Sequence, residues 1–322
     1  MERKNKIFVI AVTLCLGVCV AAYLAYSGLR VLQQNAFQRR VLAARAQAWQ
    51  GLQKTLEAEI AGFHGESAVI VKDLTFGWQY SYNKDKRFPA ASVVKIPIMA
   101  ACFYAAREGK LSPDETVVLR EAHKTGGSGI LKNIAAGTPF SVEKLIEIMI
   151  TESDNTASNI LISRLGFDYL NASFTRMGLR HTSISRKMMD FRCRKQGVEN
   201  FTTAQDVAFL LERMYRRQFV SRRVSERCLE MLLDQKVNDR IPKKLPAELP
   251  VAHKTGLERY VCHDTGIVFT DAGDFLICVL TRSPQRARSV KNFIANLALS
   301  TYQNYERLPA SRYSFVTETR RP

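Results

Sequence analysis

The sequence predicts an α+β fold with one antiparallel sheet of about five strands, flanked by N- and C-terminal helices, and an all-helical subdomain inserted into it. Runs rich in β-branched and aromatic residues, typical of strands, occur near both ends of the chain at 67–71, 76–82, 266–270 and 275–281. Helical spacing of apolar residues dominates between them, from about 142 to 233. The distant strands must therefore meet in one sheet, and the helices must pack as a separate layer.

The N-terminus predicts a membrane anchor. Residues 1–6 carry three basic residues, and residues 7–29 form a run of 23 residues without a charge. Such a run is long enough to span a bilayer. A cleaved signal peptide usually has a shorter apolar region followed by small residues, an alternative that Ala22 and Ser27 leave open. The basic residues on both sides of the run do not fix its orientation.

The rest of the chain divides into three expected parts. Residues 30–48 read as a helical stalk, rich in Ala and Gln. Residues 49–305 are expected to form one large domain, and 306–322 a tail. With 46% hydrophobic residues, the chain has enough apolar side chains for a substantial core. No internal repeat or low-complexity linker interrupts it.

Ser92 and Lys95 stand at the start of an almost unbroken apolar run, which predicts a helix buried in the core. Residues three apart on a helix share one face, so the lysine amine lies beside the serine hydroxyl. A hydroxyl is a poor nucleophile until a base takes its proton, and a lysine whose pKa is lowered by burial can be that base. The pair predicts a nucleophilic serine.

The spacing alone is common, so its companions decide the interpretation. Ser141-Val142-Glu143-Lys144 shows the same pattern, yet it is typical of a helix N-cap. Ser92 is different because Ser153-Asp154-Asn155 and then Lys254-Thr255-Gly256 follow it. A second Lys-Thr-Gly at 124–126 precedes Ser153 and runs into a glycine-rich loop, so it is rejected as the third motif. Lys254 instead precedes strand-like runs, which places it on a sheet edge.

The ordered motifs Ser-x-x-Lys, Ser-Asp-Asn and Lys-Thr-Gly are the signature of class A β-lactamases and penicillin-binding proteins. Residues from about 49 to 305 therefore resemble the class A β-lactamase family of penicillin-recognising serine hydrolases. This resemblance implies a domain with a β-lactamase/transpeptidase-like fold. It implies no cofactor and no metal.

The resemblance also implies roles for individual residues. Ser92 would be the acylated nucleophile, and Lys95 its general base. Ser153, helped by Lys254, would pass a proton to the leaving nitrogen. The implied substrate contacts come from Asn155, Thr255, Lys254 and Gly256, and the implied oxyanion hole from the backbone N–H groups of Ser92 and Leu257.

One part of the family pattern is missing. Class A enzymes carry a glutamate, with an asparagine four residues later, that activates the water which hydrolyses the acyl-enzyme. The corresponding stretch, 184–191, contains no such pair, and the acids nearby are Asp190 and Glu199. Asp190 is our candidate for the deacylating base. Deacylation is therefore the step that the sequence leaves in doubt.

Three functions remain open. The first is a hydrolase that opens β-lactam amides through an acyl-enzyme. The second is a D,D-peptidase acting on peptidoglycan stem peptides. The third is a membrane-anchored binding or sensor protein that becomes acylated and releases slowly. Because β-lactams and wall precursors are met outside the cytoplasmic membrane, we expect a single-pass protein with an extracytoplasmic domain.

The composition adds weaker signals. A net charge of +17 and an arginine cluster at 213–227 would suit anionic wall polymers or lipid headgroups. Nucleic-acid binding is not favoured, because no recognised motif accompanies the charge. The cysteines outside the apolar run allow at most two disulfides, and Cys102 and Cys278 are expected to be buried thiols. His253 is expected to lie in the strand of Lys254.

Overall fold

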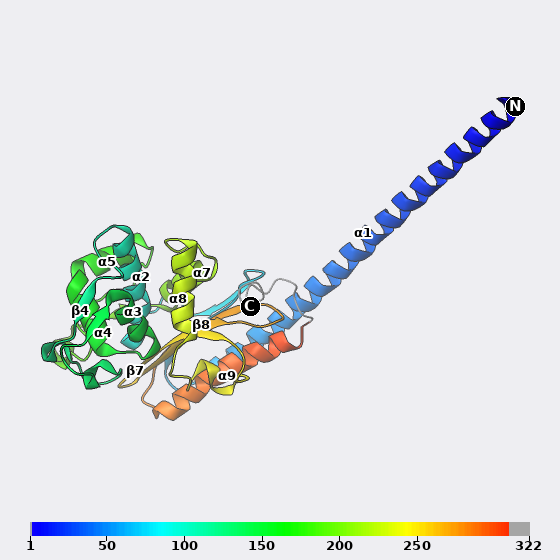
Figure 1. Ribbon diagram of the computed structural model, residues 1–322. Coiled ribbons are helices and arrows are strands. Elements are labelled where there is room, and N and C mark those ends of the chain that lie inside the picture. Colours follow the sequence, from blue (N-terminus) through cyan, green and yellow to red (C-terminus); the bar gives the residue numbers. More distant parts are fainter. Residues whose placement is uncertain (1, 309–322) are drawn as a thin grey trace. The chain divides into compact units, whose positions relative to one another are not determined.

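The α+β fold is confirmed in the computed structural model, which describes residues 2–308 (Figure 1). The expected tail lies almost entirely outside the described residues. Contacts divide the chain into two units, one up to Leu52 and one from Gln53 onwards. The first unit consists of most of helix α1 (Glu2–Ala61), and the second contains the sheet and the other helices.

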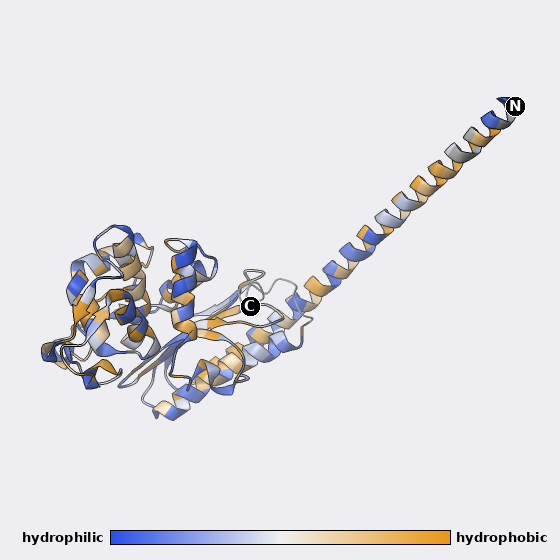
Figure 2. Ribbon diagram, in the orientation of Figure 1, coloured by the Kyte–Doolittle hydropathy of each residue, from blue (hydrophilic) through white to orange (hydrophobic). Residues whose placement is uncertain are grey.

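Helix α1 carries the apolar run near its N-terminus, and Figure 2 shows this stretch giving way to more hydrophilic turns. The most apolar 18-residue window has a mean hydropathy of 2.7 and is not buried. By length and composition this helix could cross a membrane, a criterion that a signal sequence would also meet. Ile7 and Phe8, for example, are exposed.

The last turns of α1 belong to the second unit and pack in its core. Leu56 and Ile60 are buried there. Glu59 accepts a hydrogen bond from Ser300, and Phe63, just beyond the helix, stacks on Phe293 with ring centroids 4.1 Å apart. Ser300 and Phe293 both lie on helix α9 (Ala287–Glu306), so the terminal helices of this unit pair with each other.

The main sheet has five antiparallel strands in the order β2-β1-β9-β8-β7. Their bounds are β1 Glu66–Asp73, β2 Gln79–Tyr82, β7 Val251–Glu258, β8 Val261–Val268 and β9 Phe275–Arg282. Helix α9 packs on β8 and β9 from one side, while α7 (Ala204–Tyr215) and α8 (Arg222–Leu233) lie on the other (Figure 1). Covered on both faces, β8 is buried along its whole length.

Two strands differ from their predicted extents. The run 76–82 contributes only residues 79–82 to β2, because the Asp73 carboxylate accepts hydrogen bonds from the N–H groups of Thr75 and Phe76 and turns the chain. Strand β8 begins at Val261, five residues before the predicted start. Its first half was missed because it is polar: it contains the buried His263 and Asp264.

The helical subdomain contains α2 (Lys95–Arg107), α3 (Val142–Thr151), α4 (Asn155–Leu165) and α5 (Phe167–Arg176). A short helix, α6 (Phe191–Lys195), was not predicted from the sequence. Small two-stranded sheets join β3 (Phe88–Pro89) to β6 (Phe201–Thr202) and β4 (Thr116–Val118) to β5 (Pro139–Ser141). Short 3-10 turns lie at Ala91–Val94, Glu121–His123 and Leu131–Asn133, and a further one, Ile241–Lys244, packs on α9 and β8.

Helix α2 is the centre of the second unit. Ten of its 13 residues are buried, which agrees with the prediction of a core helix. Pro97 is its third residue and so lies in the first turn of the α-helix, where a proline is tolerated. Ser141 caps α3 by accepting a hydrogen bond from the N–H of Lys144 at 3.1 Å, as predicted.

Candidate active site

Ser92 lies in the 3-10 turn Ala91–Val94 that leads into α2. Val93 and Val94 are buried beside it, while Ser92 itself is only partly buried. Ala91 adopts a φ of 44°, a left-handed conformation that is uncommon for a residue with a Cβ. The sharp turn fixes the backbone that carries the predicted nucleophile. Strain of this kind is often stored at functional sites.

Lys95 is completely buried one turn after Ser92. Its Nζ donates hydrogen bonds to the backbone oxygen of Ser153 at 2.6 Å, to Ser153 Oγ at 3.3 Å and to Asn155 Oδ1 at 2.9 Å. Burial lowers the pKa of Lys95 to about 7, although the charges of Asp154 and Glu258 oppose the change. A substantial fraction of this amine is therefore neutral near neutral pH, as a general base requires.

Ser153 lies between α3 and α4 with a φ of 52°, again left-handed. Its hydroxyl also accepts a hydrogen bond from Lys254 Nζ at 2.9 Å, so it is shared by two lysines. Lys254 is completely buried on the edge strand β7. Burial, followed by repulsion from Lys95, lowers its pKa well below the ordinary value. One residue from each of the three sequence motifs is thus brought into a single group: Lys95, Ser153 and Lys254.

Asn155 connects this group to the glycine-rich loop after residue 124. Its Nδ2 donates to the backbone oxygen of Gly126 at 3.0 Å, and its backbone N–H donates to that of Ser128 at 3.1 Å. A Cβ on Gly127 would meet Asn155 Nδ2 at 2.8 Å, and one on Gly129 would meet the Asp154 carboxylate at 2.2 Å. The loop can approach the site only with glycine at these positions. The rejected Lys-Thr-Gly therefore borders the site without being its third motif.

The third motif approaches the nucleophile through a glycine. A Cβ on Gly256 would lie 3.2 Å from Val93 Cγ2 and 3.3 Å from the Cβ of Ala91. Gly256 thus lets β7 pack closely on the Ser92 turn. Thr255 is buried, whereas Leu257 is about half exposed at the outer end of β7. Apart from Asn155 on α4, the predicted substrate-contacting residues therefore follow one strand beside Ser92.

His253 lies one residue before Lys254 and is buried, as expected, in β7. Its Nδ1 is 2.9 Å from Asp264 Oδ1 on β8, and its Nε2 is 2.9 Å from Asn238 Oδ1. The charge of Asp264 acts to raise the pKa of Lys254 and partly offsets the effect of burial. Asp264 thus influences the charge of the site from the neighbouring strand.

The loop between β-bridge residue Ser183 and β6 carries the two acids that could replace the missing glutamate. Asp190 caps α6, because its Oδ1 accepts a hydrogen bond from the N–H of Cys193 at 2.9 Å. Hydrogen bonds from the backbone and side chain of Cys193 hold the pKa of Asp190 below its usual value. Glu199 pairs with the buried Arg186 at 2.6 Å. Both carboxylates thus have structural partners.

Two residues of the site were missed in the sequence. Arg186 is 2% exposed and also pairs with Glu258, two residues beyond Gly256, at 3.1 Å. Neither residue belongs to a motif, and their separation of 72 positions gives no local signal. Only the path of the loop across the end of β7 brings them together.

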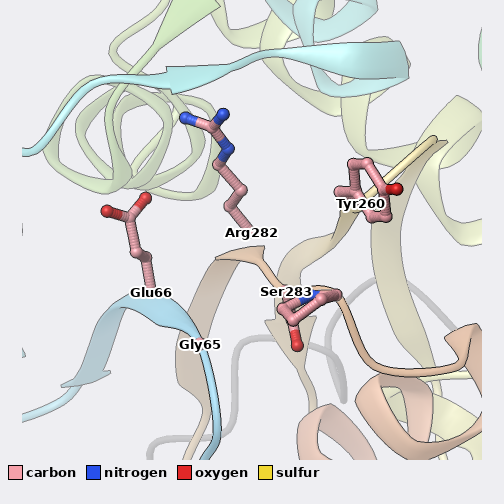
Figure 3. A pocket seen from close by; sticks show the side chains of 6 residues that line it. Gly65, Glu66, Tyr260, Arg282 and Ser283 are labelled. Carbon is pink, nitrogen blue, oxygen red and sulfur yellow. The ribbon is translucent and has the colours of Figure 1, made fainter.

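Two cavities lie outside the motif residues. One of about 350 Å³ is lined by Gly65, Glu66, Tyr260, Arg282, Ser283 and Pro284, at the end of the sheet (Figure 3). The other, of about 380 Å³, is lined in part by Thr125, Asn159 and Lys187 and borders the glycine-rich loop. Within residues 2–308, no group of three or more His, Cys, Asp or Glu side chains is arranged to hold a metal ion.

Comparison with known sequences identifies the family. The sequence model of the beta-lactamase enzyme family matches residues 51–305. Beta-lactamase CARB-3 of Pseudomonas aeruginosa is 27% identical over 54% of this chain and 61% of its own length. Extended-spectrum beta-lactamase PER-1 of the same organism is 25% identical over 74% of this chain and 85% of its own length. The chain thus spans about three-fifths of relatives such as CARB-3 and PSE-4.

Solved structures agree with the match to the beta-lactamase enzyme family. A beta-lactamase from Sphaerobacter thermophilus has a TM-score of 0.73 and 29% identity, covering 81% of this chain and 99% of that one. PBP-A has a TM-score of 0.73 and 28% identity, and the match covers 80% of this chain and 97% of PBP-A. A mutant of PBP-A, with a TM-score of 0.73, 27% identity and the same coverage, was solved as an acyl-enzyme complex with penicillin G. Because the family model matches most of the chain and the fold agrees with its members, this chain belongs to the beta-lactamase enzyme family.

Proposed function

We propose that this protein is a serine hydrolase that opens β-lactam amides through an acyl-enzyme on Ser92. The observation that carries the proposal is the pair of buried lysines around Ser153, in which the pKa of Lys95 is lowered to about 7. A neutral amine beside a nucleophilic serine is the arrangement that activates a hydroxyl. Family membership and the acyl-enzyme of PBP-A with penicillin G support the same chemistry.

The acylation step follows from these groups. Ser92 Oγ attacks the β-lactam carbonyl carbon while its proton passes to neutral Lys95. The C–N bond of the ring then breaks, and the nitrogen takes a proton from Ser153, which regains one from its lysine partners. The product is an ester on Ser92. The negative oxygen of the intermediate would be bound by the N–H groups of Ser92 and Leu257, and loss of one such donor typically costs about 10²–10³ in rate.

Substrate recognition is proposed along β7. The carboxylate of the substrate would bind Lys254 and the hydroxyl of Thr255, since both belong to the strand beside the nucleophile. The side-chain amide of the substrate would contact Asn155. Gly256 allows the strand to come close to Ser92 without a clash.

The hydrolysis of the ester distinguishes this function from its alternatives. Asp190 remains the proposed base, but it caps α6, and Glu199 is bound to Arg186. These contacts favour an acyl-enzyme that forms readily and decays slowly, as in a binding or sensor protein. The same nucleophile could also serve a D,D-peptidase on peptidoglycan stem peptides.

A single experiment tests the proposal and separates these functions. The full chain in mild detergent is mixed with fluorescent penicillin, and its intact mass is followed over time. A mass increase of one penicillin that then disappears supports hydrolysis, and a persistent increase supports slow release. A parallel reaction with a peptide ending in D-Ala-D-Ala, assayed for free D-Ala, tests the peptidase. Absence of any mass increase, together with penicillin that remains unhydrolysed in the same reaction, would overturn the proposal.

We also propose that α1 anchors the protein in the cytoplasmic membrane with the catalytic domain outside. The length and hydropathy of its apolar stretch support an anchor. The location of β-lactams and wall precursors supports the orientation.

A further inference from the structure

Four side chains form a closed ring of ion pairs that we call the clasp: Arg186, Arg194, Glu199 and Glu258. Arg186 Nη2 lies 2.6 Å from Glu199 Oε1 and 3.1 Å from Glu258 Oε1. Arg194 completes the ring, with Nε 3.3 Å from Glu199 Oε2 and Nη1 2.9 Å from Glu258 Oε2. Two positive and two negative charges thus compensate one another.

The clasp joins a loop to a strand. Three of its members lie at 186–199, a segment that contains α6 and Asp190, whereas Glu258 is the last residue of β7. The opposite side of the segment is held by Asn159 of α4. Asn159 donates to the backbone oxygen of Met188 at 3.1 Å and accepts from its N–H at 2.7 Å. Segment 186–199 is therefore tied to the helical subdomain by Asn159 and to the sheet by Glu258.

Ion pairs on a protein surface usually contribute little, so burial decides how much the clasp matters. The side chain of Arg186 is 2% exposed, and those of Glu199 and Glu258 are 11% and 22% exposed. Removing one partner of a buried charge is costly, because the remaining charge has lost its compensation. Because Arg186 is buried, loss of one of its partners in the clasp should cost more stability than loss of an ion pair on the surface.

We propose that Glu258 is a positioning residue that anchors segment 186–199 to β7 through Arg186 and Arg194, and that fixes the end of the strand beside Leu257. This inference rests on the proposed function, because Leu257 is the proposed oxyanion donor. Glu258 touches neither substrate nor the reacting atoms in this role. It acts through the loop and the strand that it joins, and its charge also acts on Lys95 from a distance.

The first test measures the loop itself. Glu258→Gln keeps the size of the side chain but removes its charge. Glu226→Gln is the matched control, since Glu226 also bridges two arginines, Arg217 and Arg222, but on α8. Hydrogen exchange is followed by mass spectrometry on the full chain in detergent. We expect amides at 187–198 to exchange about tenfold faster in Glu258→Gln than in the wild type, and no change there in the control.

The second test measures the reaction. The rate of labelling by fluorescent penicillin should fall about tenfold in Glu258→Gln and stay unchanged in the control. The dependence of the labelling rate on pH is a second measurement, and it would stay the same if Glu258 had a purely structural role. The groups that act on Lys95 are Asp154, Glu258 and Lys254. Loss of the negative charge of Glu258 lowers the pKa of Lys95, so the rise in rate with pH should move to lower pH.

The outcomes separate the two proposals. Exchange at 187–198 identical to the wild type, together with unchanged labelling, would overturn the role of Glu258. If the wild type is neither labelled by penicillin nor able to hydrolyse it, the proposed function fails, yet the exchange experiment still decides whether Glu258 anchors the loop. Should Glu258→Gln not fold, Arg194→Gln opens the same ring from its more exposed side, at 28% exposure, and is judged by the same exchange measurement.

Discussion

Ser153 accepts hydrogen bonds from two lysines that would repel each other if both were charged. Lys95 and Lys254 are both buried, and burial is the main cause of the lowered pKa of each. In such a coupled pair the first proton leaves readily, because its loss relieves the repulsion. The hydroxyl between them can then pass a proton from one side to the other. Through these contacts, residues of three motifs that are separate in sequence would form one proton-transfer unit.

Acylation should therefore depend on pH in a defined direction. Lys95 accepts the proton of Ser92 only when neutral, and its pKa is about 7. We expect the labelling rate with fluorescent penicillin to rise as pH rises through about 7, measured at saturating and limiting penicillin from about pH 5 to 9. A rate that is constant over this range would show that the neutral form of Lys95 is not required.

Ser92 is predicted to be the covalent nucleophile. Ser92→Ala removes the attacking oxygen, so labelling should be abolished while the fold is retained. Ser141→Ala is the control, because this serine shares the Ser-x-x-Lys spacing but caps α3. It should keep full labelling and lose about 1 kcal/mol of stability, measured by thermal unfolding. Labelling that persists in Ser92→Ala would assign the nucleophile elsewhere.

At the scale of elements, the loop around α6 carries Asp190, the proposed base for hydrolysis of the acyl-enzyme. A positioned general base contributes about 10²–10⁴ in rate, or about 3–5 kcal/mol of barrier. If Asp190 supplies it, Asp190→Asn should leave acylation intact and slow release further, as followed by intact mass. Asparagine is also a good N-cap, so α6 should be preserved and the effect on chemistry isolated. Release at an unchanged rate would exclude Asp190 as the base.

The elements themselves were largely predictable. Helix α3 has the predicted bounds. The motif Ser153-Asp154-Asn155 was expected between two helices, but only Ser153 and the N-cap Asp154 lie there, because α4 begins at Asn155, one residue earlier than predicted. The motifs predicted that Ser92, Lys95, Ser153 and Lys254 converge, since their spacing and order are specific. The clasp was not predictable, because an ion pair across 72 positions leaves no periodic signal. Nor was the left-handed backbone of Ala91, since alanine gives no indication of a positive φ.

Across the whole molecule, much of the arginine cluster is compensated locally. Arg216 pairs with Glu212, and Arg217 and Arg222 share Glu226. Arg227 binds Glu143 and Glu147 on α3. These pairs reduce the field that an anionic polymer would experience at α7 and α8. The positive net charge is therefore less concentrated there than the sequence suggested, and contact with wall polymers or lipid headgroups remains a prediction.

The proposed topology predicts that the catalytic domain is accessible to protease added outside the cytoplasmic membrane. Protease added to spheroplasts should remove the catalytic domain, because the anchor would leave it outside the membrane. A cytosolic protein, probed in the same sample by immunoblot, should stay intact. Protection of the catalytic domain equal to that of the cytosolic protein would reverse the topology.

The buried lysines also make the folded chain a weaker binder of protons than the unfolded chain. For Lys95 the pKa is about 7 in the fold against an ordinary value of 10.5. Below about pH 7 both states hold the proton, and the fold bears the full cost of a buried charge. Between pH 7 and pH 10.5 the unfolded chain binds more protons than the folded chain, so the contribution of Lys95 to the stability of the fold rises with pH. The protonation state that readies Lys95 for catalysis is therefore also the one that the native structure tolerates best.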